Sequence, residues 1–230
     1  MTNMFCESAF FGVVISLLAY ELGMLLKKKF GLPIFNPLLI SIAVVIVFLA
    51  VFDIDYQNYN DGAKYLSYLL TPATVCLAIP LYEQMEALKK NIKAILAGIL
   101  SGVLTSLTVV LALALIFNLN HKMYVTLLPK SITTAIGMGI AEELGGYVTI
   151  TVATIVITGV LGNIIGEGLC KLFHIEEPIA KGVALGTASH AIGTARAMEM
   201  GEIEGAMASL SIAVAGLLTV AGASVFSYFW

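Results

Sequence analysis

GTASHAIGTAR, residues 186–196, places a histidine and an arginine among glycines, alanines and hydroxyl side chains. The chain around this stretch is 59% hydrophobic, only 12% of its residues are charged, and its mean hydropathy is +0.97. In so apolar a setting, an imidazole and a permanent cation are costly unless they face a polar cavity or a partner. The stretch therefore indicates an interrupted, polar segment within a membrane protein.

Long uncharged runs surround this segment. The runs at 94–117, 144–166 and 205–230 are each long enough to cross about 30 Å of hydrocarbon at about 1.5 Å per residue. Little of the chain remains for a soluble domain, so we expect one membrane domain over residues 1–230. The expected fold is an all-α, polytopic membrane protein with about seven transmembrane helices, at roughly 8–26, 33–52, 65–82, 94–117, 147–169, 179–198 and 205–229.

Residues 118–147 are ambiguous, because Pro129-Lys130 and Glu142-Glu143 interrupt their apolar patches. If this segment re-enters the membrane on one side, eight Lys and Arg residues fall on one face and four on the other. If it crosses once, the split is seven to five. The positive-inside rule thus favours re-entry only slightly, and both alternatives place the amino terminus outside.

The expected helices at 65–82 and 179–198 are both marginal spans broken by helix-disturbing residues, prolines in the first and glycines in the second. A pair of interrupted segments at corresponding places in two halves is typical of a transporter binding site. The first half of the chain is expected at 8–117 and the second at 147–230. With re-entry of 118–147, three-helix repeats of opposite orientation result, one from the helices at 33–52, 65–82 and 94–117 and the other from those at 147–169, 179–198 and 205–229. We therefore expect an inverted-repeat, transporter-like fold with two crossing discontinuous helices.

A broken helix at membrane depth releases backbone N–H groups that suit a small carboxylate. We expect Lys130 or Arg196 to balance its charge, and His190 to contact it or carry a coupling proton. Three alternatives stay open: Lys130 as a loop lysine, Arg196 extending to the interface, and Asn163 in an interhelical hydrogen bond. The candidate substrate-binding residues are Thr71, Pro72, Ala73, Thr74, Lys130, Ser131, Thr133, Thr134, Asn163, Thr187, Ser189, His190, Gly193, Thr194 and Arg196.

Glycines four residues apart recur along the apolar helices. The pairs are Gly98/Gly102, Gly162/Gly166 and Gly182/Gly186. Such small-residue faces permit close packing between helices, within the chain or in a homodimer.

Enzyme chemistry finds little support in the sequence. It contains no HExxH, GxSxG, SxxK, Walker A or dinucleotide-binding motif, and Ser189 and His190 are adjacent on a helix, where side chains point about 100° apart. Cys6, Cys76 and Cys170 are far apart and lack CxxC spacing. We expect no catalysis, metal, cofactor or nucleic-acid partner.

Three runs carry a family resemblance: LLPKSITTAIGMGIAEELGG (127–146), TGVLGNIIG (158–166) and IAKGVALGTASHAIGTARAMEMGEIEGAMASL (179–210). They resemble the LrgB/CidB family of bacterial membrane proteins. The resemblance implies a plasma-membrane location, a smaller LrgA-type membrane partner, and a fold similar to the cation:proton antiporter and bile-acid symporter group.

The same resemblance implies two alternative functions. One is antiholin-like restraint of murein hydrolase activity and autolysis, and the other is transport of small monocarboxylates of the pyruvate and glycolate class. A holin-type task requires neither a deep His190, nor Lys130, nor two interrupted helices. We therefore expect a proton-coupled monocarboxylate transporter.

Overall fold

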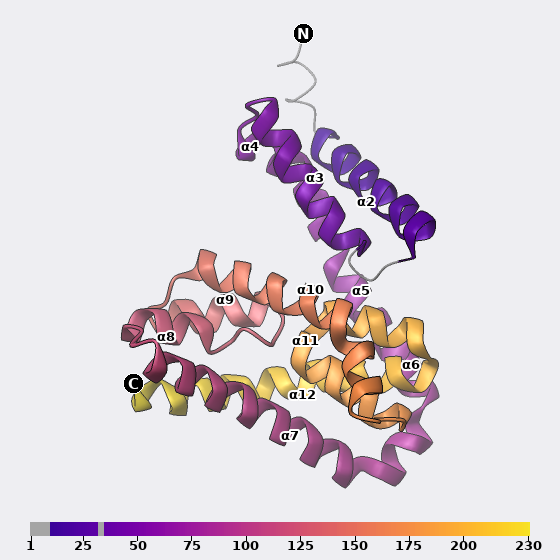
Figure 1. Ribbon diagram of the computed structural model, residues 1–230, viewed down its shortest axis with the longest axis vertical. Coiled ribbons are helices and arrows are strands. Elements are labelled where there is room, and N and C mark those ends of the chain that lie inside the picture. The colour runs from indigo at the N-terminus through magenta and orange to yellow at the C-terminus, as the bar shows by residue number, and fades with distance from the viewer. Residues whose placement is uncertain (1–9, 32–34) are drawn as a thin grey trace. The chain divides into compact units, whose positions relative to one another are not determined.

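The computed structural model describes residues 10–31 and 35–230, with the side chains in these ranges except those of Leu70 and Thr74. Within these ranges every regular element is a helix, which confirms the all-α expectation (Figure 1). Cys6 and the first two residues of each of the helices expected at 8–26 and 33–52 lie outside the described residues. The chain divides into two compact units, Met1–Cys76 and Leu77–Trp230, which are taken in turn.

The first unit is built on glycine contacts between helices. A Cβ on Gly12 would collide with the backbone of Tyr59, and one on Gly23 would lie 2.7 Å from the carbonyl oxygen of Pro37. The hydroxyls of Ser16 and Tyr59 are 2.7 Å apart in the same interface. The helices of this unit are α2 (Phe11–Phe30), α3 (Pro37–Val51), α4 (Tyr56–Ser67) and α5 (Leu70–Cys76).

The helix expected at 65–82 is interrupted, as predicted. It is divided among the end of α4, the short α5, and α6 (Ala78–Glu83), which belongs to the second unit. Pro72 and Pro80 are each the third residue of a short helix. Proline is tolerated there, because the first N–H groups of a helix have no intrahelical acceptor. The prolines therefore fall where new helical segments begin.

Three long helices frame the second unit: α7 (Met85–Ile116), α10 (Val148–Leu172) and α12 (Glu202–Phe226). By length and composition, four helical stretches among the described residues can cross a membrane, at 56–83, 85–116, 148–172 and 202–229. This is fewer than the seven expected. The short apolar α3 has 15 residues, and α2 carries a glutamate and ends in three lysines.

Residues 118–147 fold back on themselves and are called hairpin 1. They contain α8 (His121–Leu127) and α9 (Thr134–Glu143), joined by a tip at residues 128–133. The backbone N–H of Tyr147 donates to the Thr126 hydroxyl over 2.8 Å, and the Lys122 ammonium lies 4.2 Å from the centre of the Tyr147 ring. The two ends of hairpin 1 are therefore adjacent, which is the course that the re-entrant alternative requires.

The helix expected at 179–198 is α11 (Pro178–Met200), and it is broken in the middle. Ser189 has φ −133° and ψ 16°, and His190 has φ 42° and ψ −140°, so neither residue is helical. Left-handed φ is uncommon for a residue with a side chain, so surrounding contacts must hold His190 in this conformation. The predicted interruption is confirmed, and it falls within GTASHAIGTAR.

The course of α11 differs from the expected crossing helix. A Cβ on Gly182 would lie 3.0 Å from the Glu204 Cα, and one on Gly205 would lie 3.2 Å from the Met198 Cα. Residues 182 and 198 are thus close to consecutive residues of α12, whereas a continuous helix would separate them by about 24 Å. α11 is therefore a second hairpin, hairpin 2, with arms at 178–186 and 191–200 and a tip at 187–190.

Two features of the break explain this reversal. The left-handed backbone of His190 turns the chain, and the absence of a side chain at Gly193 lets the arms approach. A Cβ on Gly193 would lie 2.6 Å from the carbonyl oxygen of Leu185 on the opposite arm. The arms therefore pack backbone to backbone just below the tip.

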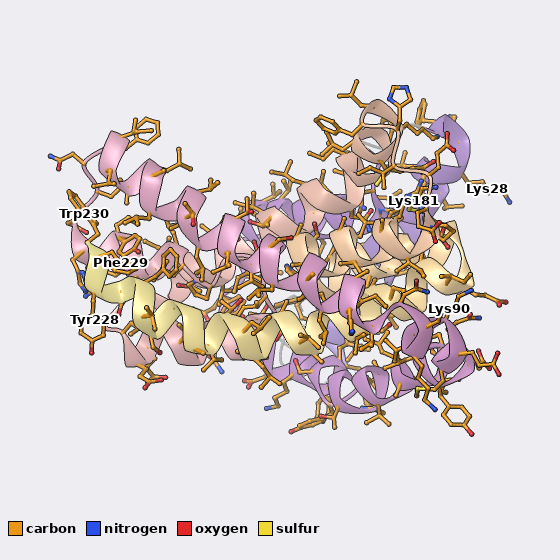
Figure 2. All side chains as sticks on the ribbon, turned by 90° about the horizontal axis from the view of Figure 1, so that it is seen from below. Lys28, Lys90, Lys181, Tyr228, Phe229 and Trp230 are labelled. Carbon is orange, nitrogen blue, oxygen red and sulfur yellow. The ribbon has the colours of Figure 1, made fainter. Side chains whose placement is uncertain are left out.

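The second unit has two chemically different ends (Figure 2). Lys90 and Lys181 lie at one end, called the lysine end, and Tyr228, Phe229 and Trp230 lie at the other, the aromatic end. The Trp230 indole donates to the carbonyl of Leu119 over 2.6 Å, so hairpin 1 starts at the aromatic end. Hairpin 2 starts near Lys181, at the lysine end. The two hairpins therefore enter the unit from opposite ends.

Candidate functional site

The hairpin tips meet along one face of α7. Gly98, Gly102 and Ser106 lie on successive turns of that face. A Cβ on Gly98 would lie 3.2 Å from Val183 Cγ1, and one on Gly102 would lie 2.8 Å from Thr187 Cγ2. One turn further, the Ser106 and Ser131 hydroxyl oxygens are 3.1 Å apart. Along α7, the tip of hairpin 2 is thus followed directly by the tip of hairpin 1.

Hairpin 1 and the tip of hairpin 2 also meet on α10, at Ile155. Its carbonyl accepts a hydrogen bond from His190 Nε2 over 3.0 Å, and its side chain fills the space where a Cβ on Gly137 of α9 would be. One turn along, a Cβ on Gly159 would lie 2.7 Å from His190 Nε2. α10 therefore holds the imidazole from two successive turns while packing on hairpin 1.

The polar groups released by the break of α11 are mostly bonded within the protein. The Thr194 hydroxyl donates to the carbonyl of His190 over 3.0 Å, and Asn163 Nδ2 donates to the carbonyl of Ile192 over 2.8 Å. The His190 side chain is 3% exposed. His190, Gly193, Thr194 and Asn163 thus form the support of the tip rather than a free surface.

A cavity of about 970 Å³ lies between α7, α10 and the first arm of hairpin 2. Most of its wall is apolar, formed by side chains such as Ile95, Leu161 and Val183. Polar side chains from α7, α10 and both hairpins also line it. Those at the two tips and on the facing turn of α7 are Ser106, Lys130, Ser131, Thr187 and Ser189, and the others include Asn91, Ser101, Thr105, Thr158 and Glu177.

Lys130 is the cation of this cavity. Its ammonium donates to the Ser131 hydroxyl over 3.0 Å and to the Ser106 hydroxyl over 3.3 Å. In the described part of the chain, no carboxylate forms an ion pair with it. A positive charge held only by hydroxyls at the end of an apolar cavity favours an anion beside it.

Arg196 lies elsewhere, at the base of hairpin 2. Its guanidinium pairs with Glu167 of α10 and with Glu199, and Glu167 also pairs with Lys171 over 2.8 Å. These groups line a separate cavity of about 520 Å³, which shares Cys170 and Ile175 with the larger one. The charge of Arg196 is therefore balanced within the protein, and the pair fastens the second arm to α10.

The other predicted residues are not gathered at the tips. Thr71, Pro72 and Ala73 are exposed on α5 in the first unit, and the side chain of Thr74 lies outside the described residues. Thr133 precedes α9 and Thr134 begins it; both are half-buried and outside the cavity lining. Of the residues predicted for substrate binding, the structure brings four together at the cavity: Lys130, Ser131, Thr187 and Ser189.

Ser106 is a polar cavity residue that the sequence reasoning missed. It lies in a long apolar helix, where a serine usually bonds to its own backbone. A signal was nevertheless present, because Ser101, Thr105 and Ser106 cluster within an otherwise apolar, uncharged run. Such a cluster indicates the turn of a transmembrane helix that faces polar groups.

Several long apolar helices, with two hairpins entering the second unit from opposite ends, define a multi-pass membrane protein. Residues 16–229 match the model of the LrgB-like family, and the chain belongs to that family. It is 42% identical over 212 residues, 92% of each chain, to proteins named "Antiholin-like protein LrgB" from Bacillus mycoides (strain KBAB4), Bacillus cereus (strain B4264) and Bacillus anthracis (strain CDC 684 / NRRL 3495). No solved structure matches the chain.

Proposed function

We propose that this chain is a carrier, not an enzyme, that moves small monocarboxylates of the pyruvate and glycolate class across a bacterial plasma membrane with an LrgA-type partner. The observation that carries the proposal is the state of Lys130. Its ammonium is bonded by two hydroxyls, has no carboxylate partner among the described residues, and lines a cavity between membrane-spanning helices. One cation without a counter-charge matches a ligand with one carboxylate.

The hairpins provide the alternating-access geometry. α7 followed by hairpin 1 and α10 followed by hairpin 2 form two consecutive pairs that run in opposite directions. Inverted pairs of this kind place a substrate between their interrupted segments. The substrate site is therefore at the two tips, in place of the crossing of 65–82 with 179–198, and the inverted repeat is smaller than the three-helix repeat expected from the sequence.

The charges of the second unit orient it in the membrane. Lys122 follows His121, which bonds to Trp230 at the aromatic end, and Lys130 is at a tip. Lys90 and Lys181 lie at the lysine end (Figure 2), with Lys89 and Lys93 beside Lys90 on α7, and Lys171 and Arg196 line one cavity with Lys181. By the positive-inside rule the lysine end faces the cytoplasm, and the aromatic side chains lie at the outer interface. The folding back of α11 supports this orientation, because it brings Arg196 to the same side as the lysines. An amino terminus outside the cell remains part of the proposal.

His190 is the proposed carrier of the coupling proton. Its Nε2 donates to the Ile155 carbonyl, so its Nδ1 is the nitrogen that can take up a proton. Because this ring also clamps the tip of hairpin 2 to α10, a change in its charge acts directly on the element that borders the cavity. Proton uptake and tip movement are thereby linked.

The test is uptake of radiolabelled pyruvate and glycolate into liposomes holding the purified protein, with and without its LrgA-type partner, under an imposed pH gradient. We expect gradient-dependent accumulation that Lys130→Gln lowers at least tenfold, that Lys130→Arg partly retains, and that the exposed Lys90→Gln leaves unchanged. His190→Ala is expected to remove the dependence on the gradient. Wild-type uptake in Lys130→Gln with normal expression would remove Lys130 from the mechanism.

A second candidate function is antiholin-like restraint of murein hydrolase export and autolysis. It is favoured by the name of the Bacillus relatives, which are similar over 92% of this chain. This function predicts that deletion changes the export of peptidoglycan hydrolases while carboxylate flux stays the same. Absence of flux from folded protein in both liposome preparations would favour it.

A further inference from the structure

Thr187 is anomalous among the buried hydroxyl groups of the protein. Thr187 is 6% exposed. Among the buried side-chain oxygen and nitrogen atoms of the described residues, its Oγ1 is the one without a hydrogen-bond partner. A threonine or serine in a helix normally donates to the carbonyl four residues earlier. Thr194 and Ser211 do so here, over 3.0 and 2.7 Å. A buried hydroxyl without a partner requires an explanation, such as a bound ligand or water.

The packing of Thr187 fixes which branch of the side chain meets the helix. Its methyl group faces α7, where a Cβ on Gly102 would lie only 2.8 Å from Cγ2. A β-branched side chain in a helix has few alternative rotamers, so this contact also fixes the hydroxyl. Thr187 lines the large cavity together with Lys130, Ser131 and Ser106. Thr187 therefore lies in the wall of the cavity that contains Lys130, and its unbonded hydroxyl is buried in that wall.

The spacing along α7 suits a short carboxylate that carries a second oxygen. Thr187 lies against Gly102, and the Lys130 cluster lies against Ser106, one helical turn or about 5.4 Å further along. When the carboxylate of such a ligand is bound to Lys130, an oxygen on the ligand's second carbon can reach Thr187. Resting on the proposed function, we propose that Thr187 is a specificity-determining residue that hydrogen-bonds this second oxygen. It thereby selects 2-hydroxy and 2-oxo acids over plain carboxylates.

Glycolate and acetate form the matched pair of probes, because they differ by one hydroxyl. Each is used unlabelled to inhibit uptake of radiolabelled pyruvate by the reconstituted protein, and the measured quantity is the ratio of their half-inhibitory concentrations. The wild type is expected to prefer glycolate. Valine has nearly the same shape as threonine but lacks the hydroxyl. Thr187→Val is therefore expected to reduce the preference about tenfold, which is the effect of one lost hydrogen bond, mainly because glycolate binds more weakly. Thr187→Ser is expected to retain it.

The outcomes separate this inference from the function on which it rests. An unchanged ratio in Thr187→Val, with pyruvate uptake intact, would overturn the role of Thr187 and leave the carrier standing; the hydroxyl would then be a structural group that binds water. Equal inhibition by glycolate and acetate in the wild type would also overturn it. Absence of carboxylate uptake in the wild type would overturn the carrier and this inference together. Gel-filtration profiles and thermal unfolding of the variants identify misfolding. If Thr187→Val does not fold, the ratio of half-inhibitory concentrations is measured in Thr187→Ser, and loss of the glycolate preference there would contradict the inference.

Discussion

Hairpin 1 and hairpin 2 have similar outlines but different tips. The tip of hairpin 1 presents Lys130, whose ammonium donates to the hydroxyls of Ser106 and Ser131 and forms no ion pair among the described residues, whereas the tip of hairpin 2 is bonded to α10 through His190 and supported by Asn163 and Thr194. One tip thus offers an uncompensated charge and the other a defined shape. The proposed site for a small anion uses both, and each comes from a hairpin that enters the unit from a different end.

The hairpins also differ in how they are packed. The first arm of hairpin 2 contacts three helices through glycine: Gly98 on α7, Gly166 on α10, and its own Gly186 against α12. Such contacts bring backbones close and leave little space for movement without a concerted shift. The sequence pairs Gly98/Gly102, Gly162/Gly166 and Gly182/Gly186 all lie in or against this arm and the tip that follows it. Hairpin 2 is therefore the more sensitive of the two to added volume.

The largest expected effect follows from that packing. In Gly186→Ala the new Cβ would lie 2.7 Å from the Cα of Ala208, so α12 must shift; overpacking of this kind costs about 1–3 kcal/mol or more. We expect a clear fall in the thermal unfolding temperature in detergent. The matched control is Gly168→Ala on α10, where a Cβ meets nothing within 4 Å and the gain in helix propensity is up to about 1 kcal/mol. Equal behaviour of the two variants would mean that hairpin 2 is not packed as described.

A smaller effect is expected at the support of the tip. Asn163→Leu removes the donor to the Ile192 carbonyl and leaves that group without this bond, at a cost of about 1–3 kcal/mol. Ser101→Ala on α7 removes a hydroxyl that is exposed and bonds within its own helix, so we expect a change within about 0.5 kcal/mol. Thermal unfolding measures both. If Asn163→Leu is as stable as the wild type, the break of α11 does not depend on α10.

The sequence predicted the positions of both interruptions but not the path of the chain beyond them. Pro129-Lys130 and GTASHAIGTAR marked the tips, because proline, glycine and charged residues are unfavourable inside a membrane helix. The reversal at His190 was not predictable, since 179–198 has the length of a span, and its direction depends on two backbone conformations and on the contact of Gly193 with Leu185. Tertiary contacts between residues of different helices decide that course.

The candidate site was also predicted only in part. Lys130 and Thr187 could be identified by their chemistry, because a charge or a hydroxyl near an interruption is typical of a binding site. Ser106 was missed because its role depends on which face of α7 meets hairpin 1. Arg196 was predicted as a counter-charge for substrate, and only the three-dimensional course of hairpin 2 shows that Glu167 and Glu199 accompany it. The role of Thr71 to Thr74 stays a prediction.

The smallest effect is expected at the base of hairpin 2, where Arg196 pairs with Glu167. Both side chains are about a third exposed, 28% and 30%, and partly exposed ion pairs contribute about 0.2–1 kcal/mol. Glu167→Gln should therefore lower stability slightly, and the loss should shrink as salt screens the charges. Because Glu167 also pairs with Lys171 and Arg196 with Glu199, a double-mutant cycle of Glu167→Gln and Arg196→Gln isolates the pair: the double variant should lose less stability than the sum of the two single losses. A salt-independent loss above about 2 kcal/mol, with the two single losses simply adding, would mean that Glu167 acts through burial, and the base of hairpin 2 would then be as tightly fixed as its tip.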